Sequence, residues 1–164
     1  MLKTLSRLAP IRRFKTKTPF LLIGLLFLNG CGVEESRYDL LNGGSISFAE
    51  LRNKVVLINY WAEWCRPCRV EIPELNHFAQ EYPNRVRVLS VNFDGVKGEL
   101  LFRQVQALGI EFDTLLQDPR NDLGVPESGG LPETIVLSGG KVREVLLGPQ
   151  TRQSLEAILS APVL

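Results

Sequence analysis

The sequence predicts an α/β fold in which a central mixed β-sheet is flanked by helices on both faces. Short apolar runs rich in β-branched residues alternate with longer segments of helical periodicity. The last two apolar runs are separated only by Ser138-Gly139-Gly140, a turn sequence that predicts a hairpin. Alternating strands and helices build parallel pairs, whereas a hairpin adds an antiparallel strand, so the sheet is expected to be mixed.

The elements of the first half follow from local signals. A strand is expected at residues 45–48, after the turn Asn42-Gly43-Gly44. The next strand, residues 55–60, reads Val-Val-Leu-Ile-Asn-Tyr, a run suited to burial on both faces. A helix is expected from about residue 67 to residue 82, and a further strand at residues 86–93.

The second half continues the alternation and ends in the hairpin. We expect a helix at 98–108 that stops at Gly109, followed by a short strand at 112–115. Strands at 134–137 and 141–147 form the hairpin. Thr151 is placed to cap a last helix, whose core-facing residues are expected to be Leu155, Ile158 and Leu159.

Two thiols separated by two residues carry the chemistry of this chain. Cys65 and Cys68 follow the second strand closely, so they are expected at a strand-to-helix junction. Unpaired backbone N–H groups and the helix dipole stabilise a thiolate there, which is the reactive form of cysteine. We expect Cys65 to be the nucleophile and Cys68 to resolve the mixed disulfide. Trp64 is expected to cover the reactive thiol and bind substrates, and Arg66 to favour the thiolate.

Other uses of a C-x-x-C pair fit the sequence less well. A structural zinc site needs two more ligands, and the remaining candidates are His77, which falls on the polar side of its helix, and the distant Cys31. Haem attachment requires histidine where Arg69 stands. A static disulfide across two residues closes too small a loop to restrict the unfolded chain much. The pair is therefore interpreted as a redox-active disulfide, with no metal and no other cofactor expected.

The N-terminus has the pattern of a secretion signal. Residues 1–30 hold six basic residues and no acidic residue, and they include a nine-residue apolar run at 20–28. That run is too short for a membrane span, which needs about 20 residues. Leu28-Asn29-Gly30-Cys31 resembles the lipobox of bacterial lipoproteins, which predicts lipidation of Cys31, although Asn29 departs from the usual residue. An ordinary cleaved signal with a stray thiol, or an uncleaved anchor, is the alternative.

Removal of this segment changes the charge of the remainder. The whole chain has a net charge of +1, whereas residues 31–164 keep 13 basic and 18 acidic residues, a net charge of −5. No nucleic-acid partner is expected, because phosphate binding needs a concentrated basic face. We expect a signal at residues 1–30, a lipidated polar tether at 31–42 and one folded domain at 43–164.

Two segments resemble the active site of thioredoxins. Residues 59–68 read Asn-Tyr-Trp-Ala-Glu-Trp-Cys-Arg-Pro-Cys and are similar to the thioredoxin active-site strand and turn. Residues 130–134, Gly-Leu-Pro-Glu-Thr, are similar to the loop that carries a cis-proline in that family. Residues 68–75 and the strand-helix unit at 86–108 resemble more narrowly the TlpA-like, cytochrome c maturation type of membrane-tethered thioredoxin. The resemblance covers residues 43–161 and implies a thioredoxin-like fold.

The resemblance assigns roles to further residues. It implies that Pro132 is cis, which would leave the Leu131 backbone free to pair with an extended substrate strand. Thioredoxins carry a buried aspartate where this chain has Asn59, which cannot titrate. Glu71, on the apolar side of the helix after the cysteines, is the candidate proton carrier, as in TlpA-like proteins. The alternative is that Pro73 kinks the helix and turns Glu71 into water.

Three functional hypotheses follow. The first is a periplasmic, lipid-anchored thiol-disulfide oxidoreductase of the bacterial cell envelope that reduces disulfides in secreted proteins, including apocytochrome c. Its partners would be oxidised substrate proteins and a membrane thiol-disulfide reductase as electron donor, and the chain is expected to be a monomer. The second is a redox sensor or copper chaperone of the same fold. The third is a non-catalytic interaction module with a fixed disulfide.

Overall fold

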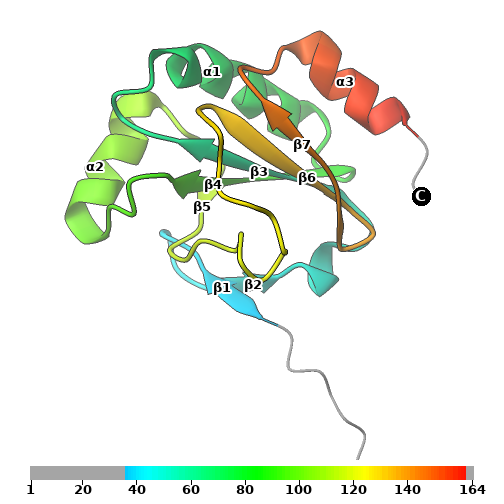
Figure 1. Ribbon diagram of the computed structural model, residues 1–164, viewed down its shortest axis with the longest axis horizontal. Coiled ribbons are helices and arrows are strands. Elements are labelled where there is room, and N and C mark those ends of the chain that lie inside the picture. The colour runs from blue at the N-terminus through cyan, green and yellow to red at the C-terminus, as the bar shows by residue number, and fades with distance from the viewer. Residues whose placement is uncertain (1–35, 162–164) are drawn as a thin grey trace, which may run out of the picture. The chain divides into compact units, whose positions relative to one another are not determined.

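The computed structural model describes residues 36–161 and contains a five-stranded mixed sheet (Figure 1). The strands lie in the order β5-β4-β3-β6-β7. Parallel pairs join β3 to β4 and β4 to β5, whereas β6 runs antiparallel to β3 and β7 antiparallel to β6. The expected mixed sheet is therefore confirmed. The bounds of its strands are β3 Val55–Trp61, β4 Val86–Asn92, β5 Asp113–Thr114, β6 Glu133–Ser138 and β7 Lys141–Leu147.

Three α-helices connect and follow these strands: α1 Arg66–Glu81, α2 Gly98–Leu108 and α3 Arg152–Ser160. Gly109 ends α2 in the left-handed conformation, with a φ of 67°, which glycine adopts without a steric penalty. The side chain of Thr151 accepts a hydrogen bond from Ser154 N and caps α3. The predicted helix ends are confirmed at these two positions.

The three α-helices pack on one face of the sheet. Leu57 of β3 lies in a buried cluster with Leu75 of α1 and Leu155 of α3. Trp61, on the same side of β3 as Leu57 because side chains alternate along a strand, lies in a cluster with Leu101 of α2. The connections from β3 to β4 and from β4 to β5 step in the same direction, so right-handed crossovers place α1 and α2 on the same side.

The opposite face is covered by an N-terminal hairpin and a one-turn 3₁₀ helix. Strands β1 (Arg37–Asp39) and β2 (Ser45–Ser47) pair antiparallel, and η1 (Ala49–Leu51) follows them (Figure 1). In the described part of the chain, η1 is the only helix on this face, so the layering is more one-sided than the sequence suggests. The buried cluster on this face joins the hairpin and η1 to β3 and includes Tyr38, Ile46, Phe48, Leu51, Val56, Ile58 and Tyr60.

The expected boundary between tether and domain is wrong by several residues. Residues 37–39, placed by the sequence in a polar tether at 31–42, form β1, and the Tyr38 side chain is only 3% exposed. Tyr38 stacks near Phe48, with ring centroids 4.9 Å apart, and its hydroxyl donates to Asp122. A three-residue strand with one buried side chain shows no periodicity, which is why the sequence pattern missed it. The rest of the expected signal and tether, including Cys31, lies outside the described residues.

The active-site end of the sheet follows from the register. In β3, residues 56–61 are all buried, as expected of a strand covered on both faces. Tyr60, near its C-terminal end, pairs with Glu133, the first residue of the antiparallel strand β6. The segment that enters α1 after β3 and the segment that precedes β6 therefore lie at the same end of the sheet. Within residues 36–161 no helix has the length and apolar character needed to cross a membrane.

Candidate active site

Cys65 and Cys68 form a disulfide at the N-terminus of α1. Cys65 is the N-cap residue, and its Sγ accepts a hydrogen bond from the backbone N–H of Cys68 at 3.2 Å. Cys65 is 3% exposed, whereas Cys68 is completely buried. A Cys65 thiolate would thus meet both a backbone donor and the positive end of the helix dipole. This geometry suits Cys65 to nucleophilic attack, and that role stays a prediction.

The turn before the cysteines is held by neighbouring elements. Cys65 N donates to Ala62 O at 3.1 Å, and α1 begins one residue later with Pro67 in its first turn, where a missing N–H costs no helical hydrogen bond. The side chain of Glu63 accepts from Gln104 Nε2 at 2.8 Å, and its backbone carbonyl accepts from Arg69 at 2.8 Å. These contacts fix the path of the chain into the disulfide.

Trp64 and Arg66, which flank Cys65 and were singled out in the sequence, are both exposed to solvent. Trp64 is 65% exposed, and its indole N–H donates to the Asp94 carboxylate, with the shorter of two contacts at 3.0 Å. The link to Asp94 ties the cysteine turn to the loop after β4. Arg66 is exposed, so water screens its effect on a Cys65 thiolate.

Glu71 lies inside the protein, three residues after Cys68 and on the same side of α1. Its side chain has no exposed surface, and α1 continues through Pro73 to Glu81, so the alternative in which Glu71 turns into water does not apply. Oε1 accepts from Gln150 N at 3.0 Å and Oε2 from Asn59 Nδ2 at 2.8 Å. Burial raises the pKa of Glu71 to about 7, although both hydrogen bonds oppose the rise.

Asn59 links Glu71 to β6. Its Nδ2 group also donates to Thr134 Oγ1 at 3.1 Å, so one amide serves two acceptors. The carbonyl oxygen of the same side chain is buried and has no hydrogen-bond partner among the described residues. An uncharged amide therefore occupies the position of the thioredoxin aspartate, and the titratable carboxylate sits beside it on α1.

The Leu131–Pro132 segment lies at the same end of the sheet as the disulfide. The Leu131–Pro132 peptide bond is cis, as expected. Pro132 immediately precedes β6, and its carbonyl accepts from Gly148 N at 2.9 Å. Leu131 is half-buried and packs against the cluster that contains both cysteines. The structure thus brings the two motifs together, whereas the contact of Leu131 with a substrate stays a prediction.

Sequence reasoning missed the residues that contact the start of β6, directly after this loop. Arg120 and Glu133 form a buried ion pair, and the Arg120 guanidinium lies over the Tyr60 ring, 4.3 Å from its centroid. The Tyr60 hydroxyl donates to Asp118 at 2.6 Å, and burial together with Asp118 raises the Tyr60 pKa. Residues 118–126 lack periodicity, and an acidic residue at the start of a strand, such as Glu133, is typical of an exposed end, so no sequence signal pointed to this ion pair.

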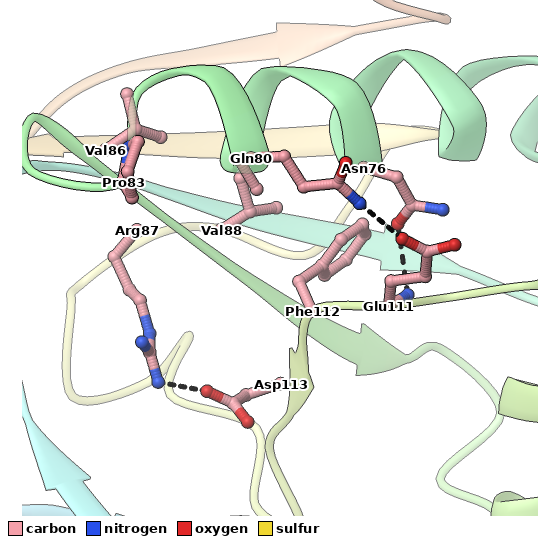
Figure 2. A pocket seen from close by; sticks show the side chains of 10 residues that line it. Asn76, Gln80, Pro83, Val86, Arg87, Val88, Glu111, Phe112 and Asp113 are labelled. Atoms are coloured by element: carbon pink, nitrogen blue, oxygen red, sulfur yellow. Dashed lines mark hydrogen bonds and ion pairs between the residues drawn. The ribbon is translucent and has the colours of Figure 1, made fainter.

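The other features of the described surface lie outside the cysteine site. A hollow of about 270 Å³ lies between the C-terminal half of α1 and the edge of β4, lined by residues such as Gln80, Arg87 and Phe112 (Figure 2). None of the cysteine-site residues lines it. His77 is exposed, as expected. Within residues 36–161, no three His, Cys, Asp or Glu side chains are grouped as a metal site would require.

Comparisons with known proteins agree with this site. Residues 34–145 match the AhpC/TSA family. The thiol-disulfide oxidoreductase ResA of Bacillus thuringiensis is 29% identical over 122 residues, which cover 73% of this chain and 69% of ResA. The thioredoxin-like protein YneN of Bacillus subtilis is 30% identical over 120 residues, covering 71% of this chain and 69% of YneN.

A solved structure shares both the fold and a part of the sequence. The DsbF homologue of Corynebacterium diphtheriae superposes with a TM-score of 0.65 at 26% identity, over 77% of this chain and 83% of that protein. The chain therefore belongs to the AhpC/TSA family, and it is a thiol-disulfide oxidoreductase with a thioredoxin-like fold.

Proposed function

We propose that this oxidoreductase is tethered in the bacterial cell envelope and acts mainly as a reductant of disulfides in secreted proteins. The observation that carries the proposal is the position of the Cys65–Cys68 disulfide at the N-terminus of α1, with the buried Glu71 one turn further along. A residue with a pKa near 7 beside a resolving thiol is suited to proton exchange at neutral pH.

The exchange proceeds in two balanced steps. The Cys65 thiolate attacks one sulfur of the substrate disulfide, forming a mixed disulfide and releasing one substrate thiolate. Cys68 then loses its proton and attacks the Cys65 sulfur, which releases the second substrate thiolate and closes the Cys65–Cys68 disulfide. Two electrons pass from the cysteine pair to the substrate. Of the two protons that end on the substrate thiols, one comes from Cys68 and the other from water, which took up the Cys65 proton when the thiolate formed.

Glu71 is the proposed proton acceptor for Cys68. Both side chains are completely buried, so bulk water is not in contact with the resolving thiol. A carboxylate three residues further along the helix occupies a neighbouring position on the same face. Residues 148–151, which precede α3, supply the backbone N–H of Gln150 that stabilises the charged form of this carboxylate. The role of Glu71 is therefore to carry one proton at the step that resolves the mixed disulfide.

The surface around Cys65 suits an extended polypeptide. Trp64, the residue before Cys65, presents a large exposed ring. Leu131, before Pro132, packs against the cluster that contains the cysteines, and its backbone groups would pair with an added strand of substrate. Leu147, which is 61% exposed and lies near Gly129 of the same loop, extends the apolar surface. We propose Trp64 and Leu131 as the substrate-binding residues.

The reducing direction is proposed from the dipeptide between the cysteines. Strong oxidants of this superfamily carry histidine there, whereas Pro67 resembles the reducing members. Stabilisation of the Cys65 thiolate by Arg66 would favour an oxidant, but Arg66 is exposed and its contribution is correspondingly small. A membrane reductase would return two electrons to the disulfide. Lipidation of Cys31 would hold the domain near that reductase, and apocytochrome c thiols are one candidate substrate class.

The decisive experiment combines a redox titration with trapping. Equilibration with glutathione buffers should place the potential of the Cys65–Cys68 couple nearer to that of thioredoxin, about −270 mV, than to that of a dedicated oxidant, about −120 mV. In a Cys31→Ser background, Cys68→Ala should accumulate mixed disulfides with partner proteins, whereas Cys65→Ala should not. A potential near the oxidant value would reject the reducing direction, and equal trapping by both variants would reject the assignment of the nucleophile.

A further inference from the structure

We infer that Arg120 is a positioning residue, which holds the Leu131–Pro132 segment in place for protein substrates by bridging the two ends of the loop at residues 126–133. The inference rests on the proposed function of that segment and names the group that maintains it. Arg120 belongs to none of the motifs that the sequence presents.

The guanidinium of Arg120 contacts both ends of this loop. Its Nη1 group donates to the Pro126 carbonyl oxygen, and its Nη2 group donates to Glu133 Oε1. Pro126 begins the segment, and Glu133 is the residue directly after Pro132. One rigid, planar group therefore joins two points of the chain that are seven residues apart, which a guanidinium does well because its donors have a fixed fork geometry.

Arg120 is itself held firmly from the side of the sheet. Its carbon Cζ lies 4.3 Å from the centroid of the Tyr60 ring, and Tyr60 belongs to the strand that leads to the cysteines. Its backbone N–H donates to Asp118 Oδ1 at 2.9 Å, and the same oxygen accepts from the Tyr60 hydroxyl at 2.6 Å. The bridge is thus anchored to the active-site strand.

The bridged loop has few other polar contacts. Residues 126–132 form no helix or strand, and they include Gly129 and Gly130, which have the largest backbone freedom. Apart from Arg120, the described polar contacts of this segment are between Ser128 and Gly130 and between Pro132 O and Gly148 N. Fixing both ends of a glycine-rich segment reduces the number of its conformations, and this lowers the entropy cost of ordering it when a substrate chain pairs with it.

The burial of both side chains decides which variant can test the bridge. The side chains of Arg120 and Glu133 are 9% and 4% exposed, so loss of either partner alone leaves a buried charge without its counter-ion. A test therefore needs a variant that removes both charges together. Arg120→Met with Glu133→Gln keeps the approximate volume of both side chains and leaves the cysteines, Glu71 and Trp64 untouched.

A charge-matched control is available at the β4–β5 edge of the sheet. Arg87 of β4 and Asp113 of β5 form a second ion pair, which lies at the hollow beside α1 (Figure 2), and no cysteine-site residue lines that hollow. Arg87→Met with Asp113→Asn removes the same two charges from the protein. Any effect that both double variants share is due to net stability or charge, and not to the loop.

Three measurements on the full-length chain separate positioning from stability. Amide hydrogen exchange of residues 127–131 should become about tenfold faster in the Arg120/Glu133 variant and stay unchanged in the control. For reduction of insulin, the protein probe, kcat/KM should fall about tenfold because KM rises. Reduction of the Cys65–Cys68 disulfide by dithiothreitol, a probe too small to pair with the loop, should stay within about twofold, because the N-terminus of α1 is unchanged.

Unchanged amide exchange at 127–131, or an equal loss with insulin and dithiothreitol, would overturn the inference. If the double variant did not fold, Arg120→Lys would replace it, because an ammonium keeps the charge beside Glu133 but lacks the planar fork; the same pattern with smaller changes is expected. If the unaltered chain failed to reduce insulin, the proposed function would be rejected, and amide exchange alone would confirm or overturn the loop-holding role of Arg120.

Discussion

The side-chain amide of Asn59 donates a hydrogen bond of 2.8 Å to the carboxylate of Glu71, and both residues are completely buried. Among the described residues, both hydrogen-bond partners of this carboxylate are donors, since its second oxygen accepts from Gln150 N. Donors stabilise the charged form, whereas burial destabilises it, and burial has the larger effect. Glu71 consequently changes its charge close to neutral pH, and its neighbours decide at which pH this occurs.

Glu71→Gln is expected to slow disulfide exchange with insulin near pH 7 by about ten- to a hundredfold, because an amide keeps the shape of the side chain but cannot accept the Cys68 proton. The step in the pH-rate profile near pH 7 should also disappear. Stopped-flow rates between pH 5 and pH 9 measure both effects. An unaltered profile would show that another group or water carries the proton.

The oxidised protein should lose stability as pH rises from about 4.5 to about 7. The pKa of Glu71 is raised from 4.5 to about 7, so below pH 4.5 the group is protonated in both folded and unfolded states. Between these values the unfolded chain is ionised while the folded one is not, and the free energy of unfolding falls. At about 1.4 kcal/mol per pKa unit, the loss is on the order of 3 kcal/mol and is complete above pH 7.

Urea denaturation of the oxidised chain at several pH values tests this loss. The comparison with Glu71→Gln isolates the effect of one group, because all other titrating residues are shared. The variant should gain stability relative to the parent as pH rises. Parallel pH dependences of the two proteins would contradict the burial of an ionisable Glu71.

Asn59→Asp should move the titration of Glu71 to higher pH. The substitution replaces an amide donor by a second carboxylate at hydrogen-bond distance, so the two acids share a proton and titrate as a pair. The step in the exchange rate should shift upward by about one pH unit or more. Thr134→Val, which removes the other acceptor of the Asn59 amide, serves as the control and should shift it far less.

Tyr38→Ala should destabilise the domain by about 3 kcal/mol, the usual cost of removing a buried aromatic side chain. Tyr38 packs on Phe48 and donates to Asp122, so the loss includes a ring contact and a hydrogen bond. Phe102→Ala, at a side chain that is 43% exposed on α2, should cost much less. Equal denaturation midpoints for the two variants would show that residues 37–39 are not part of the folded domain.

Cys31→Ser is expected to release the chain from membranes or to trap its precursor, because Cys31 alone follows the apolar run in a lipobox-like sequence. Fractionation of cells and metabolic labelling with a fatty acid measure this directly. Cys65→Ser, which leaves Cys31 intact, is the control and should retain the label. A Cys31→Ser variant that still matures and stays with the membrane would rule out the lipoprotein hypothesis.

The elements that pattern alone predicted are those with long, uniform burial. The run from Val55 to Trp61 and the hairpin of β6 and β7 differ from the expected bounds by one residue at most. The burial of Glu71 was also predictable, because helical spacing places it with Leu75 and Phe78. Its contact with Gln150 was not, since a backbone N–H 79 residues away has no signature in the sequence.

The ion pair beside the proline loop is a second contact that the sequence could not predict. Glu133 is acidic and begins a strand, which by itself suggests an exposed end. Its burial depends on Arg120, which comes from an irregular segment and reaches Glu133 only in the folded chain. Local pattern predicts which segments become strands and helices, whereas paired charges between irregular segments depend on the tertiary fold.

The two-residue length of β5 has a consequence for how this enzyme meets unfolded chains. On the side of β4 away from β3, it leaves part of β4 unpaired, and Arg87, Asp113 and Glu111 place charges along that edge (Figure 2). At the other margin β7 carries Lys141, Arg143 and Glu144 beside a register shift. Sheet edges that carry charges or a register shift resist the addition of strands from other chains, which leads to aggregation. An incoming polypeptide is thereby discouraged from joining the sheet at its edges, which favours the cysteine end as the docking place that we propose.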